Sequence, residues 1–239
     1  MKRPPIEVGF LLIALIWPAT AAWLYFVAAD PSNHAVPSLY SAGKVLQFAL
    51  PLLCWILTER TRFHISSPRL RDLGGGIAFG VAVFAAILMF YFAIVKSSAF
   101  LSGLDVQVRT KVIAMGLDSK TRYIFFVLFL SLFHSGLEEY YWRAFVFAGL
   151  RKHLPLPLAI AISSLGFMGH HVLVLSGFFP GRFWSATIPF SLAIAVGGAV
   201  WAYQYHRTRS IYPVWCGHAL VDLAILTVGF DLVFSTHIF

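Results

Sequence analysis

Long apolar runs separated by short polar loops dominate this chain. The runs are continuously apolar rather than alternating, which favours membrane-spanning helices over the strands of a barrel. At about 1.5 Å per residue each run is long enough to cross about 30 Å of hydrocarbon. The predicted spans are residues 8–29, 37–58, 73–95, 121–150, 155–176, 184–206 and 211–234. The pattern therefore predicts an all-α fold class, a polytopic transmembrane helix bundle of about seven spans.

Segment 96–122 departs from this pattern because it holds a cluster of lysines and arginines between two apolar runs. Val108, Val112 and Met115 repeat at i, i+4 and i+7, and the basic residues of this stretch lie off that stripe. Such spacing predicts an amphipathic helix at the membrane interface. The alternative, an extra span hidden here, would reverse the orientation of everything downstream.

Composition supports a membrane protein and excludes other classes. Of the 239 residues, 59% are hydrophobic and 12% are charged, whereas a soluble domain carries about 25% charged residues. The net charge of +8 does not indicate nucleic-acid binding, because lysines and arginines concentrate in short loops as the positive-inside rule requires. We expect a multi-pass protein of a bacterial cytoplasmic membrane, with its N-terminus inside.

No internal repeat or linker divides the chain, so one compact domain is expected. Within it we distinguish residues 1–120, the N-terminal spans and interfacial segment, from residues 121–239, the catalytic core in the last four spans. Gly76 and Gly80 form a GxxxG pair, a pattern typical of close packing between membrane helices.

Two adjacent glutamates, Glu138 and Glu139, interrupt the apolar run 121–150. An ionisable side chain at bilayer depth costs roughly 2.5–3.5 kcal/mol on insertion scales, so both require a compensating reason. Arg143 is four residues after Glu139 on the same helical face, which predicts an ion pair. Glu138 points about 100° away. It is therefore the candidate general base toward water.

Two further polar pairs follow in later spans. Phe167 and His171 form an FxxxH pattern, and His218 and Asp222 form an HxxxD pattern. Taken singly, each feature has a structural explanation: His134, His170 or His171 as an interhelical hydrogen bonder, and Glu139–Arg143 as a structural ion pair. The combination, in this order on successive spans, favours a reaction centre. We expect Trp142 and Phe167 to line a substrate cavity.

The set EExxxR, FxxxH and HxxxD resembles the CPBP family of intramembrane proteases (CAAX prenyl protease type 2, bacteriocin-processing and Abi-like proteins). The resemblance covers roughly residues 120–234. It implies that Glu138 activates the attacking water, that His171 helps to hold this water, and that Glu139 and Arg143 support the site. It also implies that His218 and Asp222 stabilise the oxyanion. Many relatives have Asn at the last position. An ionised Asp222 cannot donate a hydrogen bond, so we expect it to orient His218 instead.

A zinc-dependent version of the same protease is the alternative, with His171 and His218 as ligands beside a carboxylate. The HExxH pattern is absent, and the glutamate mechanism needs no metal, so no cofactor is expected. A transporter with a buried proton path and a non-enzymatic membrane scaffold are the rival classes. The expected partners are the lipid bilayer and a lipidated peptide or membrane protein as substrate. The loop Gly177–Trp184 could shape substrate access or be an ordinary interfacial turn.

Overall fold

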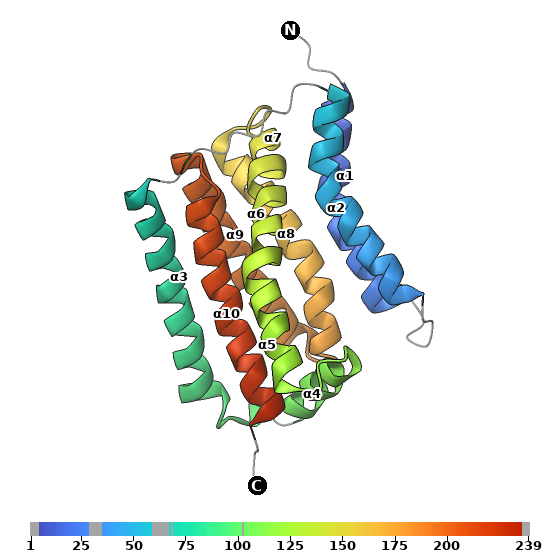
Figure 1. Cartoon of the computed structure of the whole chain (residues 1–239), viewed down its shortest axis with the longest axis vertical. Coiled ribbons are helices and arrows are strands. Elements are labelled where there is room, and N and C mark those ends of the chain that lie inside the picture. Colours follow the sequence, from blue (N-terminus) through green and yellow to red (C-terminus); the bar gives the residue numbers. More distant parts are fainter. Residues whose placement is uncertain (1–4, 29–34, 59–66, 68, 102, 236–239) are drawn as a thin grey trace. The chain divides into compact units, whose positions relative to one another are not determined.

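The computed structural model describes residues 5–28, 35–58, 67, 69–101 and 103–235. Every regular element among these residues is helical, and no strand occurs in them (Figure 1). Six helical segments are long and apolar enough to cross a membrane: Ile6–Ala28, Val36–Thr58, Leu70–Val95, Leu156–Phe178, Phe183–Thr208 and Tyr212–Phe234. The protein is thus an integral, multi-pass helical membrane protein, which confirms the predicted fold class.

The remaining predicted span, residues 121–150, has a different character from these six. The run Lys120–Leu150 is helical throughout, but α-helical and wider π-helical turns alternate along it. Local widening of this kind is frequent at functional sites. The run is not one of the six candidate spans, and its crossing of the bilayer stays a prediction. The pieces are α5 (Lys120–Leu128), η4 (Phe129–His134), α6 (Ser135–Glu139), η5 (Tyr140–Phe147) and α7 (Ala148–Leu150).

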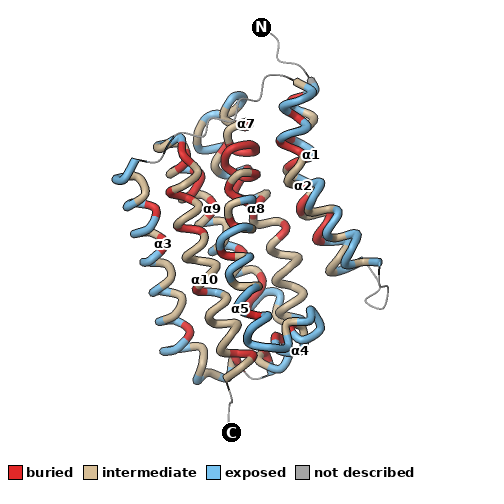
Figure 2. The backbone as a smooth tube through the Cα atoms, viewed as in Figure 1, coloured by how far each residue is buried: buried red, intermediate tan, exposed pale blue. Residues whose placement is uncertain are grey.

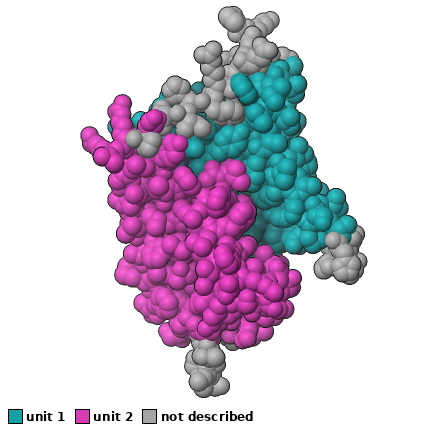
Figure 3. Space-filling model, viewed as in Figure 1, with its two compact units in different colours: residues 1–66, 138–211 teal, residues 67–137, 212–239 magenta. Residues whose placement is uncertain are grey.

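The chain forms two compact units, coloured separately in Figure 3. Unit 1 comprises residues 1–66 and 138–211, and unit 2 comprises residues 67–137 and 212–239. Besides η5 and α7, the helices of unit 1 are α1 (Pro5–Trp23), η1 (Leu24–Ala28), α2 (Val36–Thr58), α8 (Leu156–Phe178), η6 (Phe183–Thr187) and α9 (Ile188–Thr208). Besides α5 and η4, those of unit 2 are α3 (Leu70–Phe90), η2 (Tyr91–Val95), η3 (Ala99–Leu101), α4 (Leu104–Ala114) and α10 (Tyr212–Phe234).

The core of unit 1 is built around η5. All residues from Tyr141 to Phe147 are buried, and Figure 2 shows this stretch in red next to α7. Helices α1, α2, α8 and α9 all pack against η5. A segment that is apolar on every side requires neighbours on every side, so η5 occupies the interior of its unit.

A proline in α1 creates an attachment point for η5. Pro18 has no backbone N–H, so the carbonyl of Ala14, four residues earlier, lacks its usual helical donor. The Tyr141 hydroxyl donates a hydrogen bond to this carbonyl at 2.7 Å. A buried carbonyl without a partner is costly. Pro18 therefore leaves a carbonyl without a helical donor, and Tyr141 supplies the donor. Ala14 and Tyr141 are 127 residues apart in the chain.

In unit 2, α3 and α10 approach each other at glycines. Gly76 faces the backbone of Pro213, and a Cβ added at Gly80 would lie 2.9 Å from the Cα and the carbonyl oxygen of Gly217. Only a residue without a side chain fits at such a separation. The close packing that the GxxxG pattern indicates is confirmed, and its partner is the helix that carries the HxxxD pair.

Helix α4 lies within segment 96–122, where an amphipathic helix is predicted. Val108 and Val112 are buried together with Leu104, and α4 packs against α10. Met115, expected on the same stripe, lies at the C-terminal cap and is exposed. The helix ends one residue before Met115, and its place at a membrane interface stays a prediction. The apolar face of α4 covers α10 within unit 2.

Candidate active site

Glu139 and Arg143 form the ion pair that their spacing predicts. The Nε of Arg143 lies 3.1 Å from Oε2 of Glu139, and the two side chains are 2% and 0% exposed. The guanidinium carbon of Arg143 lies 4.8 Å from the ring centre of Phe167 and 5.4 Å from that of Trp201. Contact with aromatic faces stabilises a cation that has lost its water. Unit 1 thus holds a neutralised pair in an aromatic enclosure.

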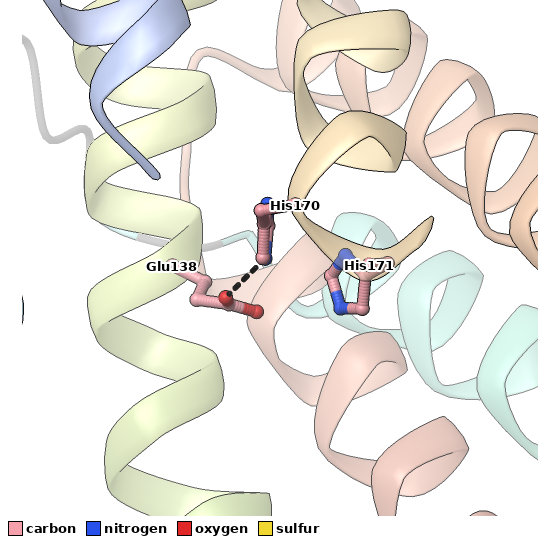
Figure 4. Close-up of side chains that lie close together, drawn as sticks. All are labelled: Glu138, His170 and His171. Carbon is pink, nitrogen blue, oxygen red and sulfur yellow. Dashed lines mark ion pairs between the residues drawn. The ribbon is translucent and has the colours of Figure 1, made fainter. Parts of the chain in front are cut away.

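Glu138 contacts a different helix. Its Oε1 lies 3.4 Å from Nε2 of His170 on α8, and both side chains are almost fully buried (Figure 4). The imidazole of His170 lies parallel to the ring of Trp142, with 5.9 Å between centroids and 5° between planes. Taken singly, His170 was interpreted from the sequence as an interhelical hydrogen bonder. The structure places its ring nitrogen next to the Glu138 carboxylate.

His171 is the next residue on α8 and is half-buried. Its Nδ1 lies 2.9 Å from the backbone carbonyl of Phe167. A carbonyl oxygen accepts only, so Nδ1 carries the proton and, in the neutral ring, Nε2 carries the lone pair. A nitrogen in this state can accept a hydrogen bond from water or bind a metal. This backbone contact therefore sets the tautomer of His171.

Trp142 and Phe167, which we expected to line a substrate cavity, are fully buried. Their rings meet edge to face at 5.7 Å, and Phe167 contacts His171 at 4.7 Å. In the described structure they hold the histidine rings in place. Contact between either ring and a substrate stays a prediction.

Glu138, His170 and His171 bring three ligand atoms within 4.8 Å of one another. Two imidazoles and a carboxylate are a donor set that catalytic zinc accepts, with the fourth position open to water. The residues therefore fit a zinc ion in chemical type. This set differs from the one expected from the sequence, because His170 takes the place of His218.

His218 and Asp222 lie on α10 in unit 2. His218 Nε2 is 3.5 Å from Asp222 Oδ1, and the side chains are 4% and 22% exposed. The spacing of four residues therefore brings the two side chains together, as predicted. His218 directly follows Gly217, which packs against Gly80 of α3. The glycine contact fixes the position of this histidine within unit 2.

Comparison with known proteins bears on all of these residues. Residues 120–224 match the family model described as Type II CAAX prenyl endopeptidase Rce1-like. The chain is similar to this family over that segment, which is less than half of its length. The match confirms the resemblance drawn from the three motifs, and all the candidate catalytic positions, from Glu138 to Asp222, lie inside it. No curated protein and no solved structure matches the chain.

The Rce1-like match bears on the general class of activity. It supports a CAAX-type intramembrane endopeptidase, and hence a hydrolase that acts on a membrane protein or a lipidated substrate in a lipid environment. The matched segment runs from the start of α5 into α10, so it draws on both units. Residues 1–119 lie outside it.

Proposed function

We propose that this protein is an intramembrane endopeptidase that uses a glutamate-activated water. Its substrate is a lipidated or membrane-anchored protein, cut at a peptide bond near the C-terminus or the membrane segment. The observation that carries this proposal is the buried Glu138 carboxylate beside two histidines of α8, inside the Rce1-like segment. A carboxylate at this depth is costly, and a reaction is one reason to keep it there.

In the proposed reaction, Glu138 accepts a proton from a water molecule that is held at Nε2 of His171. The hydroxide attacks the scissile carbonyl, and His218 donates a hydrogen bond to the oxyanion that forms. Glu138 then returns the proton to the leaving amine as the C–N bond breaks. This scheme requires that His218 of unit 2 and Glu138 of unit 1 act on the same peptide bond, which is part of the proposal.

Glu139, Arg143 and Asp222 have supporting roles in this scheme. Arg143 pairs with Glu139 at 3.1 Å, so the carboxylate next to Glu138 in the chain is neutralised. Asp222 accepts from His218 and sets the orientation of its ring, as a carboxylate does for a catalytic histidine.

The proposed mechanism uses no metal, and zinc is its rival. Glu138, His170 and His171 are the residues that would hold the ion. When bound, zinc would lower the pKa of a coordinated water to about 7 and polarise the scissile carbonyl. In that case Glu138 would be a ligand, and a different group would have to serve as the base.

The test uses full-length protein purified in detergent, as wild type and as Glu138→Gln, which keeps the size of the side chain. Asp118→Asn is the matched control, because Asp118 is an exposed carboxylate that pairs with Arg122 on the surface. Each protein is incubated with farnesylated, geranylgeranylated, unmodified and transmembrane-anchored C-terminal peptides, and mass spectrometry locates the cleaved bond. We expect Glu138→Gln to lose about 10²–10⁴-fold in cleavage rate and Asp118→Asn to match wild type.

Three outcomes would count against the proposal. A folded Glu138→Gln protein that cleaves at the wild-type rate removes the proposed base. Loss of activity with a chelator, restored by zinc, selects the metal-dependent version. A folded wild-type protein that cleaves no peptide of the panel favours the transporter and scaffold classes.

We also propose that the N-terminus lies in the cytoplasm of a bacterial cell. The connection after α7 carries Arg151 and Lys152, and the end of α9 carries Arg207 and Arg209, so both basic loops would lie inside. In intact cells, a membrane-impermeant thiol reagent should miss a His153→Cys protein and label an Asp118→Cys protein. The reverse labelling would overturn the orientation.

A further inference from the structure

His170 lies one residue before the histidine of the FxxxH pattern, and the proposed reaction gives it no role. Yet its Nε2 lies 3.4 Å from Oε1 of the Glu138 carboxylate. In Figure 4 the other carboxylate oxygen of Glu138 lies on the side of His171. The two histidines therefore meet the carboxylate on different sides.

Aromatic neighbours hold the His170 ring in one orientation. Its face is parallel to Trp142 at 5.9 Å, and Phe167 meets it edge to face at 5.5 Å. Its centroid is 4.0 Å from that of His171. His170 is 3% exposed, and Trp142 and Phe167 are more deeply buried still. A ring packed on these sides cannot rotate without displacing large side chains.

The chemistry of the pair follows from this orientation. An imidazole N–H donates to a carboxylate oxygen, and such a bond is about 2.7–2.9 Å long when formed. The observed 3.4 Å is longer, and catalytic hydrogen bonds without substrate are often long and shorten in the reacting complex. A donor on one oxygen fixes the plane of the carboxylate and leaves its other oxygen to receive a proton.

We propose that His170 is a positioning residue: its Nε2–H holds Oε1 of Glu138, so that the second oxygen is directed toward the water held at His171. This inference rests on the proposed function, because it assigns a role within the same reaction. A misplacement of about 1 Å at a reacting group can cost about 10²-fold in rate, which is the scale of effect expected when the donor is removed.

Three substitutions separate the donor from the packing. His170→Phe keeps a ring against Trp142 and has no donor. His170→Met also lacks the donor but adapts to irregular space. His170→Gln loses the ring and keeps an N–H at similar reach. If His170 positions Glu138, kcat falls about 10–100-fold in the Phe and Met variants and recovers to within about fivefold of wild type in the Gln variant, with KM little changed throughout.

A role in packing alone predicts the opposite order. In that case the Phe variant is the most active, the Gln variant is the least active, and kcat follows the Tm of each protein. That order, or wild-type kcat in a folded Phe or Met variant, overturns the inference. Stoichiometric zinc in purified wild type that is lost from both the Phe and the Gln variants also overturns it, because His170 would then be a ligand.

Glu138→Gln, measured in the same assay, separates this inference from the proposed function. If Glu138→Gln is fully active, the proposed function fails whatever the His170 variants do. If Glu138→Gln is inactive and His170→Phe is folded with wild-type kcat, the glutamate mechanism stands and only the role of His170 fails.

Discussion

The two units stabilise their buried polar groups by different means. Unit 1 encloses Glu139 and Arg143 in large rings and supplies Glu138 with a partner from another helix. In unit 2 the candidate site pair, His218 and Asp222, lies on one helix that its neighbour approaches through glycines. The candidate residues of unit 1 should therefore be sensitive to changes of charge, and the surroundings of His218 to changes of volume.

The difference follows from exposure. The Glu139–Arg143 side chains are 0% and 2% exposed, so removing either partner leaves an uncompensated charge in an apolar interior. Asp222 is 22% exposed, so protein encloses this carboxylate less completely than it encloses Glu139. The predictions below separate these two situations.

The largest effect on stability is expected for Arg143→Met, which leaves the buried Glu139 carboxylate unpaired. The free energy of unfolding should fall by about 3–5 kcal/mol, as measured by denaturant or thermal unfolding in detergent. The double variant Glu139→Gln/Arg143→Met removes both charges and should recover most of this loss. A double variant as unstable as the single one would mean that the guanidinium contributes through packing rather than charge.

A change of volume in unit 2 comes next. In Gly80→Ala the new methyl group would lie 2.9 Å from the backbone of Gly217, and overpacking of this kind costs about 1–3 kcal/mol. Gly74→Ala is the matched control on the same helix, because nothing lies within 4 Å of its Cβ position. There alanine should stabilise the helix by up to about 1 kcal/mol. Equal effects of the two substitutions on the unfolding midpoint would refute the close approach of α3 and α10.

Tyr141→Phe should destabilise unit 1 by on the order of 1 kcal/mol, because the carbonyl of Ala14 loses its donor. The cost depends on Pro18, which denies that carbonyl its helical partner. In a Pro18→Ala background the backbone N–H of residue 18 returns, and the same substitution should cost much less. A double-mutant cycle on unfolding free energies checks this. An equal loss of unfolding free energy in both backgrounds would contradict the role given to Pro18.

The smallest effect is expected for Asp222→Asn. The pair is local to one helix and its carboxylate is partly exposed, and i,i+4 pairs of this kind contribute about 0.3–0.5 kcal/mol. The unfolding free energy should change by no more than that. A loss as large as that of Arg143→Met would remove the contrast between the two units.

The features that could be predicted from the sequence are those that depend on residues only a few positions apart. The apolar runs predicted the helices, and spacing by four residues predicted Glu139–Arg143 and His218–Asp222, because helix geometry alone brings such residues together. The GxxxG pattern indicated close packing for the same reason, although it could not name Pro213 and Gly217 as the partners.

The contacts that sequence reasoning missed are those between distant segments. Glu138 and His170 lie on separate helices, and the sequence carries no signal that both adjacent histidines lie near this carboxylate. Nor could the sequence match the proline of α1 with Tyr141, since that bond depends on tertiary packing. The units divide between Leu137 and Glu138, inside a continuous helical run where composition does not change.

The central proposal is that Glu138 and His218 serve one hydrolytic reaction. Its most direct test is the single-turnover cleavage rate of wild type, Glu138→Gln, His218→Ala and the double variant, all shown to be folded. If the two residues serve one reaction, each single variant loses about 10²–10⁴-fold and the double variant is no slower than the slower single one. Losses that multiply in the double variant, or a wild-type rate in either single variant, would contradict the account.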